Sequence, residues 1–277
     1  RRRRTVLKLD TTFYHEHDVD DRHYSLDCLN VPAQFATAEE VWRLNGKLGR
    51  KQTLAKRILL ALAQRRLAEL MTVTGQAHYQ KQWTYYPEFH ELPDNIWLHG
   101  NYQSEKFFAP VADILRQQFT FRYPPTPSVE AMVARIKSGP SVAVHFRRGD
   151  YVNNARFAQT IGTVSADYYA EAMKGVQSRI GSGATYYVFS DDPAFAENGL
   201  VANVPTVPVN CCGENNDYDA MRLMSMCDHN IIANSTFSWW AAWLNPNPEK
   251  MVVAPKCWFA DGHWPDDDIC PTFWQKV

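Results

Sequence analysis

The chain has 277 residues, of which 45% are hydrophobic and 21% charged, and its formal net charge is -1. These values suit a globular protein of one large or two modest domains, and they exclude a chain whose bulk charge would bind nucleic acid. Any anionic ligand must therefore be held by a local cluster of basic residues. No apolar run is long enough for a transmembrane helix, and the basic start "RRRRTVLKLD" lacks the apolar core of a signal peptide.

The cysteines indicate reduced thiols in a cytoplasmic protein, although a membrane anchor in a segment before residue 1 stays open. No CxxC pair occurs, so the spacing typical of a zinc site is absent. Disulfide geometry disfavours a bond between adjacent cysteines. The six cysteines are Cys28, Cys211, Cys212, Cys227, Cys257 and Cys270.

The first part of the chain contains a few separate elements. Residues 5–14 predict a strand and a loop, and 54–71 predict a helix with apolar residues at helical spacing. The basic face of that helix is interpreted as a solvated surface, with a functional basic helix as the alternative. Residues 95–108 predict a short strand entering a polar loop at Gly100, and 108–119 predict a helix.

A proline-rich segment separates this part from the rest of the chain. "RYPPTPS", residues 122–128, contains three prolines, which interrupt regular structure. We interpret it as a linker between two lobes, residues 1–125 and residues 126–277.

After the linker, predicted strands and helices alternate. This pattern indicates an α/β fold with a parallel sheet covered by helices on both faces. The predicted strands are residues 141–145, 185–190, 204–209, 230–234 and 250–255, and the predicted helices are 129–137, 166–180, 193–200, 217–227 and 236–244. The two prolines of "VPTVPV" predict that residues 204–209 form an edge strand.

Polar clusters follow three of these strands, where ligands of open parallel sheets bind. Their members are His145, Arg147, Arg148 and Asp150 in the first, Ser190, Asp191 and Asp192 in the second, and Asn234, Ser235, Thr236 and Ser238 in the third. Each cluster also has a structural interpretation. The first suits surface ion pairs, the second a helix cap before Pro193, and the third a helix cap or an N-glycosylation acceptor. Three clusters at three strand ends nevertheless predict one crevice.

The chemistry of this crevice suits a nucleoside diphosphate. The start of the helix at Thr236 would supply N–H groups and hydroxyls to an anion. Arg147 and Arg148 can each donate two hydrogen bonds to phosphate oxygens. Asp191 or Asp192 could accept from a ribose hydroxyl or from guanine. Neither a P-loop nor a GxGxxG motif occurs.

The motifs resemble those of the α1,2-fucosyltransferases. The similar segments are "HFRRGDY", "YYVFSDD", "NSTFSWWAAWLN", "WLHGNYQSEKFF", and "LKLD" followed by "RHYSLDCLNV". The HxRRxD signature, His145 to Asp150, is shared more loosely with α1,6- and protein O-fucosyltransferases. The resemblance covers most of the chain, and the motifs are highly specific when taken together.

The resemblance implies two Rossmann-like lobes arranged as in GT-B enzymes, GDP-fucose as donor, inversion at the anomeric carbon, and no required metal or other cofactor. The C-terminal lobe would hold the donor, and the N-terminal lobe would hold a galactose-terminated glycan whose 2-OH is fucosylated. No nucleic-acid partner is expected. The expected substrate-binding residues are His145, Arg147, Arg148, Ser190, Asp191, Asp192, Asn234, Ser235, Thr236, Phe237, Ser238, Tyr102 and Gln103, and the catalytic ones are Arg147 and Asp150.

Two departures from the family pattern affect these expectations. The Gly-rich loop that opens family members does not occur, so we expect the front of the first lobe to be incomplete and the expressed protein to be longer. The five residues directly after Asp150, Tyr151 to Ala155, include no acid, so the candidate base of the α1,6 enzymes cannot be carried over. Asp150 is itself either the base or an arginine-paired support, and pairing would lower its pKa and weaken it as a base.

Two alternative functions are retained. One is fucose transfer to a protein or to an N-glycan core. The other is a non-catalytic sugar-binding module, which the tryptophans Trp239, Trp240, Trp258, Trp264 and Trp274 would suit. A lectin, however, has no use for two arginines beside a helix start that binds anions.

Overall fold

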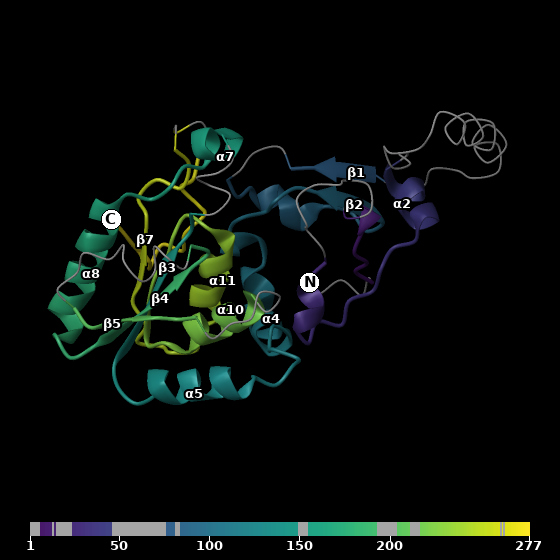
Figure 1. Cartoon of the computed structure of the whole chain (residues 1–277). Helices are drawn as coiled ribbons and strands as arrows, with labels where there is room; N and C mark the ends of the chain where they lie inside the picture. Colours follow the sequence, from purple (N-terminus) through teal and green to yellow (C-terminus); the bar gives the residue numbers. More distant parts are fainter. Residues whose placement is uncertain are drawn as a thin grey trace, which may run out of the picture. The chain divides into compact units, whose positions relative to one another are not determined.

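The computed structural model describes residues 6–12, 14, 24–45, 76–80, 84–148, 155–192, 204–210, 217–260, 262 and 264–277. The chain divides into two compact units (Figure 1). Unit 1 comprises Arg1–Gln82 and Tyr86–Tyr102, and unit 2 comprises Trp83–Tyr85 and Gln103–Val277. The helices predicted at 54–71 and 193–200 lie outside the described residues.

Unit 2 contains a six-stranded parallel sheet, which confirms the predicted α/β class. Its strands are β3 (Ser141–Phe146), β4 (Thr185–Ser190), β5 (Thr206–Pro208), β6 (His229–Ile231), β7 (Val252–Ala254) and β8 (Gln275–Lys276). Their order across the sheet is β5-β4-β3-β6-β7-β8, and every neighbouring pair is parallel. When the strands are counted from β3 as the first, this order is 3-2-1-4-5-6, which is that of a dinucleotide-binding Rossmann sheet. The strand order reverses between β3 and β6.

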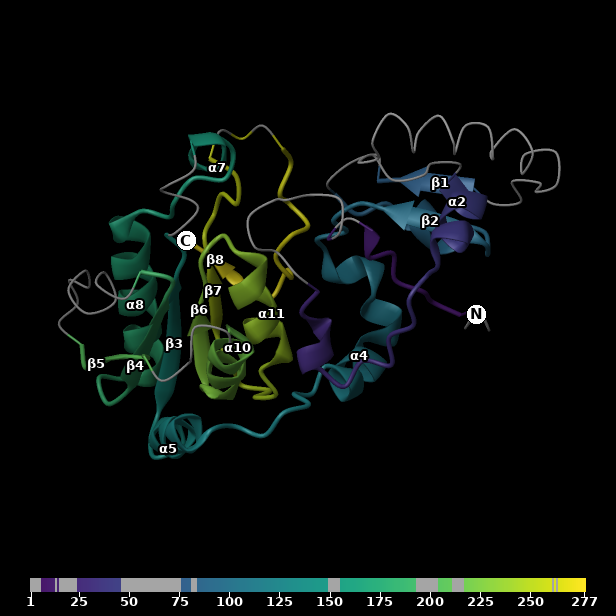
Figure 2. The same cartoon turned by 45° about the vertical axis from the view of Figure 1, so that its right-hand side comes forward.

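Helices cover both faces of this sheet (Figure 2). Helix α8 (Ala166–Ile180) packs on one face, where its buried side chains contact Val142 and Val144 of β3. The opposite face carries α5 (Pro127–Ile136), α10 (Asp217–Met226) and α11 (Thr236–Leu244), which pack around Ala143. Because strand side chains alternate between faces, one fully buried strand supplies both cores.

Local patterns located most of these elements. The predicted bounds of α8, β4 and α11 match the structure, and β5 is an edge strand as its prolines predict. Strand β8 and helix α7 (Ala155–Thr160) were not predicted. A two-residue strand is too short to show a period-2 pattern, and it joins the sheet only through β7.

The continuous part of unit 2 begins at Gln103, earlier in the chain than the lobe boundary predicted after residue 125. Helix η3 (Glu105–Phe107), helix η4 (Ala109–Val111) and helix α4 (Ala112–Gln118) precede the linker. Phe108 stacks on Trp240 of α11 at a centroid distance of 5.3 Å and an interplanar angle of 20°. Phe119 contacts the same ring at 5.3 Å. This aromatic packing joins the segment to α11 of unit 2. The periodicity of a single segment does not show such a contact.

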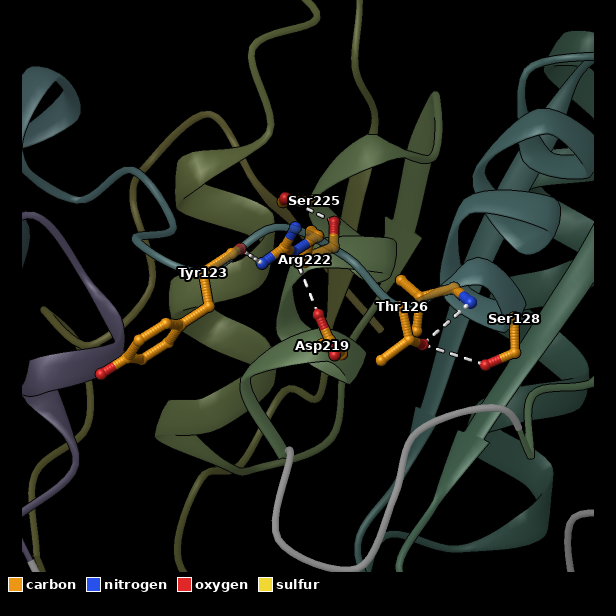
Figure 3. Close-up of polar contacts among 7 residues, drawn as sticks. Tyr123, Thr126, Ser128, Asp219, Arg222 and Ser225 are labelled. Atoms are coloured by element: carbon orange, nitrogen blue, oxygen red, sulfur yellow. Dashed lines mark hydrogen bonds and ion pairs between the residues drawn. The ribbon is translucent and has the colours of Figure 1, made fainter.

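Arg222 of α10 holds the proline-rich segment and is itself paired with Asp219 of the same helix (Figure 3). Arg222 Nη2 donates to the carbonyl of Tyr123 at 2.5 Å, and its guanidinium lies 4.8 Å from the centre of the Phe121 ring. Arg222 Nε is 3.1 Å from Asp219 Oδ1. Burial raises the pKa of Asp219, and the Arg222 charge opposes that shift. Thr126 then caps α5 by accepting from Val129 N at 3.4 Å.

Unit 1 contains a smaller parallel pair of strands. Strands β1 (Gln76–Tyr79) and β2 (Ile96–His99) pair in register from Gln76↔Ile96 to Tyr79↔His99. Helix α2 (Ala38–Asn45) and helices η1 (Leu26–Cys28) and η2 (Pro87–Glu91) complete the described elements. The strand predicted at 5–14 is reduced, among described residues, to one bridge between Leu9 and Phe35.

Candidate functional site

The three predicted polar clusters of unit 2 lie at the carboxyl ends of three adjacent strands. The order β4-β3-β6 places "FSDD", "HFRR" and "NSTFS" side by side along one edge. The central gap, between β3 and β6, is where the strand order reverses. A ligand in an open α/β sheet binds at this reversal point, because the flanking loops diverge there and leave a crevice.

Arg147 and Arg148, which follow β3, are organised by two acids that follow β4. Arg147 Nη1 lies 2.9 Å from Asp191 Oδ2, and the other oxygen of Asp191 accepts from the backbone N–H of Arg148 at 2.8 Å. Arg148 Nε donates to Asp192 Oδ2 at 3.3 Å. The backbone N–H of Asp192 in turn donates to Ser190 Oγ at 3.0 Å.

These contacts change the interpretation of the second cluster. Both carboxylate oxygens of Asp191 contact the arginine segment, so this carboxylate positions Arg147 within the protein. A guanidinium carries several N–H donors in a fixed fork, so one carboxylate contact is compatible with donation to a phosphate. The side chains of Arg147 and Asp191 are 32% and 23% exposed, so an incoming ligand can reach the pair.

His145 lies at the end of β3 and is 4% exposed. Its ring is 5.8 Å from that of Phe237 in the first turn of α11, and its Nδ1 is buried without a hydrogen-bond partner. Burial, and then the charge of Arg147, lowers the pKa of His145 to about 3, so the imidazole is neutral. A buried polar atom without a partner is unfavourable in a folded protein.

The start of α11 faces the same gap. Ser235 is the N-cap residue and is 5% exposed, but its side chain accepts no capping hydrogen bond from the helix. Ser238 Oγ donates to the Ser235 carbonyl at 3.3 Å, and Thr236 is exposed. In α8, by contrast, Ser165 caps by accepting from Tyr168 N at 3.2 Å. The first N–H groups of α11 therefore lack a serine cap and, with the positive end of the helix dipole, suit an anion.

Asn234 holds loops together at this edge. Its Nδ2 donates to the carbonyls of Ile161, Gly162 and Trp258 at 3.0, 3.0 and 3.2 Å. Asn234 is 4% exposed. This predicted substrate-binding amide is thus engaged with backbone from two other segments.

Two tyrosines that the sequence analysis missed fix the strand ends. Tyr168 Oη donates to the carbonyls of Ile232 and Val253 at 2.7 and 3.0 Å, and Tyr169 Oη donates to the carbonyl of His145 at 3.0 Å. Burial raises the pKa of both phenols, so they remain protonated donors. The signal in the sequence was a Tyr-Tyr pair in the first turn of an amphipathic helix, which periodicity alone assigns to the core.

The far end of α11 is held by two cations. Arg116 Nη1 donates to the Trp243 carbonyl at 2.6 Å while its guanidinium lies 4.0 Å from the centre of the Trp243 ring. Lys250 Nζ donates to the Asn245 carbonyl at 2.6 Å. Positive charges near a helix C-terminus interact favourably with the helix dipole, whose positive end is the N-terminus. Burial, then the Arg116 charge, lowers the pKa of Lys250 to about 8, and Glu105 opposes that shift.

Three further residues were predicted to belong to the site: Asp150, Tyr102 and Gln103. Asp150 lies outside the described residues. Tyr102 belongs to unit 1, whereas Gln103 belongs to unit 2, where its Oε1 is buried without a hydrogen-bond partner. Within the described ranges, no group of three or more His, Cys, Asp or Glu side chains could hold a metal ion. No helix of the described part is long and apolar enough to span a bilayer.

The order of the strands defines unit 2 as an α/β unit with the strand order of a Rossmann sheet, and two arginines lie at its reversal point. The family model described as glycosyl transferase family 11 matches residues 67–276. The chain therefore belongs to glycosyltransferase family 11.

Curated relatives agree with this assignment. The O-antigen biosynthesis glycosyltransferase WbnK of Escherichia coli is 44% identical over 122 residues, 43% of this chain and 39% of that protein. An alpha-1,2-colitosyltransferase of Escherichia coli is 32% identical over 183 residues, 64% of this chain and 61% of that protein. Galactoside alpha-(1,2)-fucosyltransferase 1 of Leontocebus fuscicollis is 28% identical over 168 residues, 57% of this chain and 45% of that protein. The chain thus spans less than two thirds of the length of each of these relatives.

Among solved structures, POFUT1 in complex with GDP matches 65% of this chain and 63% of its own, with a TM-score of 0.40 and 14% identity.

Proposed function

We propose that this protein transfers fucose from GDP-fucose to the 2-OH of a terminal galactose of a glycan, with inversion at the anomeric carbon. The acceptor hydroxyl oxygen would form a bond to C1 of fucose as the bond from C1 to the β-phosphate oxygen breaks. GDP would leave with that electron pair, and the hydroxyl proton would pass to a base. Asp150 remains the candidate base, with support of an arginine as its alternative role.

The observation that carries this proposal is the pair of acid-oriented arginines beside the uncapped start of α11. As GDP departs, negative charge grows on the β-phosphate. Arg147, placed by Asp191 at 2.9 Å, would meet that charge with N–H donors that are already oriented. The N–H groups at Thr236 would add partial positive charge without any mobile side chain. Neutral His145 would contribute a hydrogen bond without adding charge.

A second candidate, transfer of colitose, comes from the relatives. The alpha-1,2-colitosyltransferase of Escherichia coli is more similar to this chain than the primate fucosyltransferase is, at 32% against 28% identity. In both reactions the described arginines would stabilise a departing diphosphate. The two candidates differ only in the transferred sugar.

The test is a transfer assay on the purified protein with GDP-fucose and GDP-colitose in parallel, using a galactose-terminated oligosaccharide as acceptor. We expect a fucosylated product whose linkage and anomeric configuration, read by NMR, are α1,2 and inverted. Faster transfer of colitose would select the second candidate. Failure of both donors to react, together with absence of GDP binding by calorimetry, would contradict both candidates and support a non-catalytic module.

A further inference from the structure

A second group of polar residues lies in unit 1, at the carboxyl ends of β1 and β2. Gln80 directly follows β1, and Gly100, Asn101 and Tyr102 follow β2. Gln80 N donates to the carbonyl of His99 at 2.8 Å, which brings the two segments together beyond the last paired residues. The ends of parallel strands are where ligands of α/β units bind.

The side chain of Gln80 is oriented by the loop after β2. Its Oε1 accepts from the backbone N–H groups of Asn101 and Tyr102, at 2.8 and 3.0 Å. Only a carbonyl oxygen can accept these two hydrogen bonds, so the amide cannot be reversed. The amide nitrogen, Nε2, is then fixed on the other side, where it is buried without a hydrogen-bond partner. A buried amide donor with no partner is unfavourable in a folded protein.

The loop itself is strained at the same place. Tyr102 has a φ of 45°, a left-handed conformation that is unfavourable for a bulky residue other than glycine. A Cβ on Gly100 would lie 2.4 Å from Gln80 Cβ and 3.0 Å from Tyr102 Cε2, so only glycine fits between them. Backbone strain and an unmade hydrogen bond thus occur together around one amide.

We propose that Gln80 binds the acceptor glycan, with Nε2 donating a hydrogen bond to a hydroxyl oxygen of the acceptor sugar. This inference rests on the proposed function, because it assigns the acceptor position of that reaction. Nε2 is covered in the unliganded chain, so a neighbour must move. Tyr102 is the neighbour whose movement relieves strain, and its return to an ordinary φ offsets part of the rearrangement.

The surrounding chemistry suits a neutral sugar. Residues 79–80 and 99–102 include no Asp, Glu, Lys or Arg. The rings of Tyr79 and His99, the last residues of the two strands, lie 5.5 Å apart at 61°, and Tyr79 is 43% exposed. The Trp97 ring stacks on His99 at 5.2 Å and 15°, and Trp97 Nε1 is held by Asp10 Oδ2 at 2.9 Å. Rigid aromatic rings beside an amide donor provide apolar area and directed hydrogen bonding in one place.

The decisive variant is Gln80→Glu. It keeps the oxygen that orients the loop but replaces the amide donor by a second acceptor oxygen. We expect GDP affinity and acceptor-independent hydrolysis of GDP-fucose to stay within about twofold of wild type, while the KM for the acceptor rises about tenfold or more, the size expected for an unmade buried hydrogen bond. Gln117→Glu, the same change at an exposed position of α4, should leave the acceptor KM unchanged.

Acceptors lacking one hydroxyl at a time sharpen the test. In the wild-type protein, kcat/KM for one deoxy-galactoside should be lower than for the complete galactoside by about fivefold or more. Gln80→Glu should lose this difference and should keep the differences measured with the other deoxy-galactosides. A Gln80→Glu protein with wild-type acceptor KM, or with unchanged discrimination, would overturn the inference while leaving the proposed function intact. Absence of GDP binding in the wild-type protein would instead contradict the proposed function.

If Gln80→Glu does not fold, the wild-type protein provides a second measurement. Protein carrying ¹⁵N only in glutamine side chains can be titrated with the acceptor in the presence of GDP and followed by NMR. A shift of a glutamine side-chain amide resonance that saturates with the acceptor supports the inference. Saturation of the acceptor, judged by its own signals, without a shift of any glutamine side-chain amide overturns it.

Discussion

The carboxyl ends of the two parallel sheets differ in charge. In unit 2, Arg147 and Arg148 meet Asp191 and Asp192 at the reversal point of the strand order. In unit 1 the equivalent position is occupied by Gln80, a neutral amide, and by backbone N–H groups. The same strand geometry thus carries two kinds of binding chemistry, one suited to a diphosphate and one suited to an uncharged sugar.

The difference has a physical consequence for how each site is prepared. Arginines would repel each other and sample many rotamers, and acids placed at 2.9 and 3.3 Å hold them in one arrangement before a ligand arrives. A neutral amide needs no counter-ion, so hydrogen bonds to Asn101 and Tyr102 suffice to orient Gln80. Perturbations of charge should therefore affect donor binding and spare the acceptor.

The largest expected effect is that of Arg147→Ala. Loss of forked hydrogen bonds to the diphosphate should reduce kcat/KM by a factor of about 100 or more, which corresponds to about 3 kcal/mol of transition-state stabilisation. Arg147→Lys should restore little of this, because an ammonium cannot form the planar fork. Steady-state kinetics with GDP-fucose as the varied substrate measure the change.

A matched control is Arg43→Ala. Arg43 pairs with Glu39 at 2.7 Å on the surface of α2, where both side chains are exposed. An exposed pair of this type contributes little to stability, so activity should be unchanged. If kcat/KM of Arg147→Ala lies within a few-fold of that of Arg43→Ala, the charge of Arg147 is not used in the reaction.

The next effect is an acid dependence of stability that comes from His145. Its folded-state pKa is about 3, below the value of about 6.5 expected in the unfolded chain. The unfolded state therefore binds the proton first as pH falls, and stability present above pH ~6.5 is lost progressively toward pH ~3. The free energy of unfolding should fall by up to about 1.4 kcal/mol per pH unit in this range.

His145→Phe should remove this contribution and flatten the pH profile, while substitution of the exposed His90 by Gln should not. Urea unfolding measured between pH 4 and pH 7.5 compares the three proteins. An unchanged slope in His145→Phe would show that folding does not lower the pKa of His145.

A smaller effect is expected from salt. Raising NaCl from about 50 mM to about 500 mM shortens the screening length and should weaken GDP binding about fivefold, because Arg147 and Arg148 are partly exposed. The acceptor KM should change by less than about twofold, since the Gln80 edge contributes no formal charge. If NaCl changes GDP binding and the acceptor KM by the same factor, the proposed difference in charge between the arginine site and the Gln80 site is wrong.

No effect is expected from a chelator. The arginines and the N–H groups at Thr236 already provide positive partners for the leaving diphosphate. The acidic run Asp266–Asp268 has internal partners, since Asp266 accepts from Trp258 N at 2.5 Å and Asp268 accepts from Tyr85 N at 3.1 Å and pairs with Lys106. Turnover in excess EDTA should equal that of the untreated protein. Loss that magnesium or manganese restores would overturn this prediction.

The residue types of the donor edge were predictable from the sequence, but their partners were not. "HFRRGDY" places two arginines directly after a predicted buried strand, at the end of a parallel sheet where ligands bind. The sequence could not show that Asp191 holds Arg147 and the Arg148 backbone, because the partners are separated by the whole of α8 and β4. Gln80 belongs to no sequence motif. Only its hydrogen bonds with Asn101 and Tyr102 in the structure single it out as a candidate binding residue.

By itself the sequence determined the local elements of unit 2 and the types of residue at their ends. Helix α8, helix α11 and strand β4 have the predicted bounds, because periodicity and capping residues act within a few positions of the chain. Tertiary structure alone decided that β3 lies beside β6, that Tyr168 and Tyr169 hold the strand ends, and that Tyr102 is strained against Gln80. Parallel pairing, buried hydrogen bonds and backbone strain depend on segments distant in sequence, which no local pattern encodes.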